Sequence, residues 1–170
     1  MSNLFDKEES SVQDISFGYL DEAVWNKLRM SRTMIEGART DDGSYSNLAL
    51  MLSDECPWRT EMSTPEGSTI VLDGPIIRQY YDALDILRRI GGTVPDRKYR
   101  VDRYPTKILR EALVNAFAHR DYTSDRPVTV TVEPEAIEVW SPGGVWVPDV
   151  RGRDDLYNVR NSEVARFFRT

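Results

Sequence analysis

The stretch Glu111-Ala-Leu-Val-Asn115-Ala-Phe-Ala-His119-Arg-Asp-Tyr122 decides the fold, because it sets three polar side chains at helical spacing within a segment that otherwise has the composition of a buried helix. At ~100° per residue, Glu111, Asn115 and His119 fall in a stripe roughly 80° wide along one side of that helix. The stripe has the geometry of one wall of a binding site.

The neighbours of this polar stripe are apolar. They are Ile108, Ala112, Val114 and Ala118. The solvent face of the helix is expected on the opposite arc, at Thr106, Lys107 and Arg110. Burial of an unpaired carboxylate or amide is costly, so we expect the stripe to be satisfied either by other polar groups of the protein or by a ligand.

Composition indicates an ordinary globular chain. Of its 170 residues, 40% are hydrophobic and 29% are charged, which suits one substantial core or two small ones. There is no apolar run near the ~20 residues that a bilayer span requires, and the polar, acidic N-terminus is unlike a secretory signal. We therefore expect a cytoplasmic protein without a membrane partner. One cysteine and one histidine exclude an internal disulfide and disfavour a structural zinc site.

The net charge of −6 is unevenly distributed. Residues 1–60 carry 6 basic and 11 acidic side chains, a net charge of −5, so a site for a polyanion would lie further along the chain. Basic groups cluster ahead of the polar stripe, at Arg97, Lys98, Arg100, Arg103, Lys107 and Arg110. The side chains of this basic span are either simply exposed to solvent in the segment that leads into the helix, or they contact nucleic acid through Arg97, Lys98 and Arg100.

Periodicity and turn residues predict the order of the elements. We expect a loosely held lead-in over the first dozen residues, followed by helices at 16–30, 47–52, 75–90, about 105–120 and 162–168. The segments 58–62 and 68–72 should pair as antiparallel strands, and 127–133 and 136–140 should form a second hairpin with one buried face. Gly143 and Gly144 then permit a tight turn. Arg160 and Asn161 are expected to hydrogen-bond to the helix that carries Glu111, Asn115 and His119, which we call the motif helix.

The order of the motifs resembles one bacterial family. Glu111-x-x-x-Asn115-Ala-x-x-His119-Arg-Asp-Tyr122, a hairpin, Ser141-Pro-Gly-Gly144 and Arg160-Asn161 are similar to the transcriptional regulators labelled ATP-dependent DNA helicase RecG-related. Those proteins join a Schlafen AlbA-like DNA-binding domain to a GHKL-type ATPase-like domain. The helicase label implies little here, because the sequence lacks the GxxxxGK[ST] loop of helicase motors.

The resemblance implies an α+β fold, with helices packed on a mostly antiparallel sheet as in a GHKL α/β sandwich. It implies that Glu111 activates water and that Asn115 holds Mg²⁺ against the phosphates of ATP. It also places His119, Gly143 and Gly144 at the nucleotide. Residues 1–43 would be the tail of the AlbA-like region, and 44–170 a GHKL-like domain truncated at its C-terminus.

Two departures from the family pattern shape the expected function. Ser141-Pro-Gly-Gly144 carries no carboxylate where GHKL proteins read adenine with an aspartate, and the second glycine-rich element and the lid do not appear before Thr170. We therefore expect no ATP hydrolysis by these residues alone. The expected function is a regulatory or ligand-sensing module that meets DNA through a larger protein. The alternatives are a nucleic-acid-binding fragment and a non-catalytic scaffold that forms a homodimer.

Overall fold

The computed structural model describes residues 5–20, 38–90, 93–96, 99–102, 104–144 and 159–169. The strands are β1 (Thr60–Ser63), β2 (Thr69–Leu72), β3 (Thr93–Asp96), β4 (Tyr99–Asp102), β5 (Val128–Val132) and β6 (Ile137–Trp140). The α-helices are α3 (Asn47–Leu52), α4 (Ile76–Ile90), α5 (Thr106–His119) and α6 (Ser162–Arg169), and two short 3₁₀ helices are η1 (Phe5–Lys7) and η2 (Gly18–Leu20).

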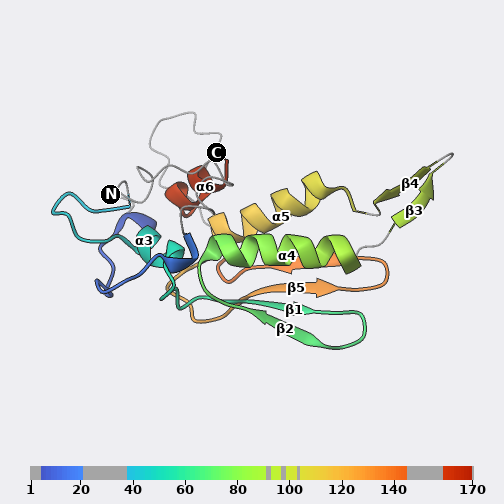
Figure 1. Ribbon diagram of the computed structural model, residues 1–170, viewed down its shortest axis with the longest axis horizontal. Coiled ribbons are helices and arrows are strands. Elements are labelled where there is room, and N and C mark those ends of the chain that lie inside the picture. The colour runs from blue at the N-terminus through green and yellow to red at the C-terminus, as the bar shows by residue number, and fades with distance from the viewer. Residues whose placement is uncertain are drawn as a thin grey trace.

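The fold is α+β, as the sequence predicts. A sheet with the strand order β2-β1-β5-β6 lies beneath α4 and α5 (Figure 1). The pairs β1–β2 and β5–β6 are antiparallel, whereas β1 and β5 are parallel, with Met62 opposite Val130. The sheet is therefore mostly antiparallel, but its two hairpins are joined by a central parallel pair that the sequence does not predict.

The buried core lies between this sheet and the helices. Along β5, Val128, Val130 and Val132 are buried, and the two threonines between them are half-buried. This alternation is the period of two that gives a strand one buried face. On α5 the buried face carries Leu109, Leu113 and Phe117, which recur at the spacing of a helix. The predicted helices at 47–52, 75–90, 105–120 and 162–168 are all confirmed.

Three expectations about the chain outside these elements need correction. From residue 5 on, the lead-in is not loose, because Asp6 is fully buried and Phe5 packs against the core, and residues 1–4 lie outside the described part. The predicted helix at 16–30 begins instead with irregular backbone and the single 3₁₀ turn η2, and residues 21–37 lie outside the described part. The basic span overlaps the antiparallel hairpin β3–β4, of which it includes the second strand, and sequence reasoning missed this hairpin. Among the described helices, none combines the length and apolar character needed to cross a membrane.

Candidate functional site

The polar stripe lies on the solvent side of α5. Glu111, Asn115 and His119 are all exposed, and so is the neighbouring Ile108, with 62% of its surface accessible. The expectation that apolar neighbours bury these groups is therefore wrong, and Glu111 and Asn115 need no protein partner to offset a cost of burial. None of the three side chains forms a hydrogen bond or ion pair with another residue that the structure describes. Their polar atoms are free to meet a ligand.

The residues that follow the stripe turn inward. Arg120 is 1% exposed and donates from its Nη2 to the carbonyl oxygens of Ser124, at 3.2 Å, and Arg126, at 2.6 Å. Its guanidinium lies 5.1 Å from the ring centroid of Tyr122, and burial lowers the pKa of Arg120. Phe5 stacks on the Tyr122 ring, with centroids 6.4 Å apart. Arg120 and Tyr122 thus anchor the end of α5 in the core.

The hydroxyl of Tyr122 is buried and has no hydrogen-bond partner among the described residues. Burial raises the pKa of this phenol, so the group stays neutral. A buried hydroxyl without a hydrogen-bond partner is costly, and the buried Nε of Arg120 lacks a partner as well among the described residues.

The loop at Ser141–Gly144 meets the end of α5 directly. The backbone N–H of Asp121 donates to the Pro142 carbonyl at 2.7 Å. Gly143 has a φ of +123°, and a Cβ on it would lie 3.2 Å from Cβ of Asp121 and 3.3 Å from Nη2 of Arg160. Both the backbone conformation and the close contact require glycine here. The positive φ that the glycines of this loop lead us to expect is present at Gly143, while Gly144 is exposed and has open space around it.

Arg160 and Asn161 complete the junction. The predicted hydrogen bond to the motif helix is confirmed for Asn161, whereas Arg160 contacts Asp121 and Gly144, which lie beyond the end of α5. The Asn161 backbone N–H donates to the Ala118 carbonyl at 2.9 Å, and its Nδ2 donates to Ala118 at 3.1 Å and to Arg120 at 2.8 Å. Arg160 Nη1 lies 3.5 Å from Oδ2 of Asp121. We call this contact of Asp121, Pro142–Gly144 and Arg160–Asn161 the motif junction.

The electrostatics of the junction favour an uncharged histidine beside it. Partial burial, and then the nearby cation of Arg160, lower the pKa of His119. The pKa of Asp121 is also lowered, first by the hydrogen bond from the Thr123 hydroxyl at 2.6 Å and to a lesser degree by Arg160. At neutral pH the junction therefore presents one carboxylate, one guanidinium and a neutral imidazole that can accept a hydrogen bond.

The residues available to a metal or cofactor are few. No group of three histidine, cysteine or acidic side chains in the described ranges could hold a metal ion. The free carboxamide oxygen of Asn115 suits a hard cation such as Mg²⁺, which often takes only one or two protein ligands and completes its shell with phosphate and water. Glu111, one turn away, could orient a water molecule. The donor set thus fits a cation delivered with a phosphate ligand.

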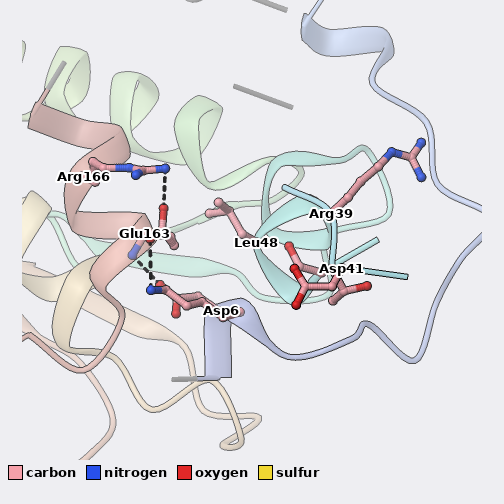
Figure 2. A pocket seen from close by; sticks show the side chains of 9 residues that line it. Asp6, Arg39, Asp41, Leu48, Glu163 and Arg166 are labelled. Atoms are coloured by element: carbon pink, nitrogen blue, oxygen red, sulfur yellow. Dashed lines mark hydrogen bonds and ion pairs between the residues drawn. The ribbon is translucent and has the colours of Figure 1, made fainter. Parts of the chain in front are cut away.

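Two hollows lie near these motifs. One, of about 450 Å³, is bordered by Glu111 but not by Asn115 or His119. The other, of about 390 Å³, lies between η1, the 39–48 segment and α6. Glu163 forms an ion pair there with Arg166, at 2.7 Å (Figure 2), and a second one with Lys7, at 3.4 Å. The lining of this second hollow balances three basic side chains against three acidic ones, so we assign no ligand to it.

The predicted nucleic-acid residues are only partly described. Arg100 belongs to β4 and pairs with Pro95 of β3, while Arg97 and Lys98 lie outside the described residues. The hairpin β3–β4 extends beyond the N-terminal end of α5, away from the four-stranded sheet (Figure 1). Its backbone is thus placed where a large partner could reach it.

Comparisons with known proteins establish the fold alone. No family model matches the chain, and no curated protein is detectably similar to it. Among solved structures, the chain resembles the DIP2311 protein from Corynebacterium diphtheriae, with a TM-score of 0.71 and 18% sequence identity over 97% of this chain. The likeness covers 39% of that protein, so the chain spans well under half of the neighbour's length.

Proposed function

We propose that this chain is a GHKL-like ligand-sensing module of a DNA-associated transcriptional regulator that works in the cytoplasm. The observation that carries the proposal is the motif junction, because three motifs far apart in the sequence meet there through direct contacts. Gly143 touches Asp121, and Asn161 bonds to the last carbonyls of α5. A structural role explains the bonds of Asn161, but it leaves the free side chains of Glu111 and Asn115 unexplained.

The proposed ligand is a nucleotide with Mg²⁺. The carboxamide of Asn115 would hold the cation and Glu111 would orient water beside it. The exposed backbone at Gly144 lets a ligand approach closely, and His119 lies beside Arg160 at the same end of α5. Since the Ser141–Gly144 loop carries no carboxylate to read adenine, we propose binding and signalling rather than turnover for this chain.

Thermal denaturation with and without Mg²⁺-ADP tests this proposal. The nucleotide should raise the melting temperature of the wild type, and Asn115→Ala should abolish the rise because the cation loses its protein ligand. Asn115→Asp is the matched variant, since it keeps an oxygen ligand and should retain much of the effect. The proposal fails if Mg²⁺-ADP leaves the wild-type melting temperature unchanged, or if it raises that of Asn115→Ala equally.

The position of the β3–β4 hairpin favours a second candidate function, direct nucleic-acid binding. A two-stranded ribbon can enter the major groove of DNA, and this one carries Arg97 and Lys98 in its connection and Arg100 in β4. Retention of duplex DNA should fall steeply with salt, because bound cations displace counterions. Replacing these three residues with alanine should remove the retention, whereas replacing Arg88 and Arg89 on α4 should not. A retention that salt does not change would exclude this candidate.

The scaffold alternative receives less support. It requires Glu111, Asn115 and His119 to be satisfied by other groups of the protein, and in the described part of the chain they make no such bonds. We therefore do not propose it.

A further inference from the structure

The 450 Å³ hollow beside α5 is built from three helices. Five of its lining residues come from α5: Thr106, Lys107, Arg110, Glu111 and Val114. Tyr80 of α4 and Phe168 of α6 close it from the other side. The hollow therefore lies where three helices converge, and its walls come from rigid elements.

The hollow carries uncompensated positive charge. Lys107 and Arg110 are both exposed, and neither has a carboxylate within ion-pair distance among the described residues. Arg110 donates from Nε to the Tyr80 hydroxyl at 3.1 Å, which holds the guanidinium at the rim and leaves its outer nitrogens free. Glu111 is the one acidic side chain that borders the hollow. Two cations against one anion favour a negatively charged occupant.

The floor of the hollow is apolar and held in place. Val114 and Phe168 are half-buried. The Phe168 ring lies 5.0 Å from that of Tyr80 and 5.7 Å from that of Phe117, measured between centroids. Contacts on both sides fix this ring, so the apolar surface exists before any ligand arrives. Ligand sites typically combine such a surface with a few polar groups.

This hollow is separate from the proposed nucleotide surface. At ~100° per residue, Lys107, Arg110 and Val114 lie on one side of Glu111 around α5, and Asn115 and His119 lie on the other. Glu111 is the boundary that the two surfaces share. A ligand in the hollow would therefore contact different side chains from a nucleotide held by Asn115.

We propose that this hollow binds a small anion with an apolar body, such as an aromatic phosphate ester or carboxylate. The anionic group would lie between Lys107 and Arg110, where a guanidinium can form charge-assisted hydrogen bonds. The apolar body would pack on Val114 and Phe168. Glu111 borders the hollow and repels such a ligand, so removal of its charge should tighten binding.

The test uses 1-naphthyl phosphate as the probe, titrated by isothermal calorimetry without divalent cations, with inorganic phosphate for comparison. The naphthyl ester should bind saturably and more tightly than phosphate. Lys107→Gln and Arg110→Gln should each weaken it by about tenfold, the typical worth of a charged hydrogen bond. Arg88→Gln, an exposed cation of α4 outside the hollow, should leave the affinity unchanged.

Glu111→Gln tests the charge of the occupant. It should tighten naphthyl phosphate by about two- to fivefold, as expected for removing an exposed like charge. The proposal is overturned if the probe shows no saturable binding, if phosphate alone binds as tightly, or if Lys107→Gln and Arg110→Gln have no effect. Weaker binding by Glu111→Gln would also overturn it. Circular dichroism melting confirms that each exposed-site variant is folded.

Discussion

His119 is the titratable residue that connects the polar stripe to the motif junction. Its pKa is lowered from the ordinary value of 6.5, first by burial and then by Arg160. Because the unfolded chain binds this proton more readily, the stabilisation by neutral His119 is complete above about pH 6.5 and is lost as the pH falls below it.

We therefore expect the wild type to lose more unfolding free energy than His119→Gln between pH 7.5 and pH 5.5. Urea denaturation at both pH values measures the difference. Arg160→Gln should reduce the pH dependence in part, since burial is the larger cause and remains. If wild type and His119→Gln show parallel pH profiles, His119 does not titrate at a lowered pKa in the folded protein.

For Glu111, Asn115 and His119, the sequence predicts their shared helical stripe correctly but not their exposure to solvent. The spacing of Glu111, Asn115 and His119 places them on one helical stripe, and α5 confirms the helix. Their exposure was not predictable, because Ile108 and Ala112 read as core residues beside them. Ile108 is in fact largely exposed, and one apolar side chain on a wet surface is common. Only the packing of α5 against α4 and α6 decides which face is buried.

Between elements, Asn161 is the residue that ties α6 to the end of α5. It is fully buried, and its Nδ2 donates to two carbonyls of the α5 terminus. Asn161→Ala leaves the Arg120 carbonyl without this donor and should cost about 1–3 kcal/mol of unfolding free energy. The matched variant Asn115→Ala changes an exposed asparagine and should stay within about 0.5 kcal/mol. Equal losses in chemical denaturation would contradict this account of the junction.

The start of α6 depends on an element that sequence reasoning missed. Oδ2 of Asp6 accepts hydrogen bonds from the backbone N–H groups of Glu163, at 2.7 Å, and Val164, at 3.2 Å, and Figure 2 shows Asp6 against the first turn of α6. The carboxylate satisfies amides that a helix N-terminus leaves unpaired. An acidic residue in a polar lead-in gave no signal of this role, because its partners are more than 150 positions away.

Asp6→Ala should therefore destabilise the protein by about 1–2 kcal/mol, the usual cost of a lost N-cap. The control is Asp41→Ala. Asp41 is exposed, borders the 390 Å³ hollow that Asp6 also lines, and has no hydrogen bond or ion pair among the described residues. Urea denaturation of both variants, with hydrogen exchange at Glu163 and Val164, measures the effect. Unchanged protection of these amides in Asp6→Ala would contradict the capping role.

Over the whole molecule, the parallel pair β1–β5 joins two hairpins that the sequence predicts separately. The alternation in 127–133 and the Pro and Gly of 63–67 each predict a local hairpin, and both are confirmed. Local signals could not predict which strands of the two hairpins meet, since α4 and α5 lie between them in the sequence. The pairing is decided by the apolar faces of the strands, which the helices cover together.

If this central pair holds the two hairpins in one cooperative unit, a cavity in β1 should weaken both. Met62 is 1% exposed and lies opposite Val130 of β5, so Met62→Ala should cost about 2–5 kcal/mol. Val71, in the edge strand β2, is 54% exposed, and Val71→Ala should cost under about 1 kcal/mol. Native-state hydrogen exchange should show that Met62→Ala lowers amide protection in β2 and β6 equally, because both strands open only with β1–β5. Loss of protection in β2 alone would mean that the two hairpins unfold independently.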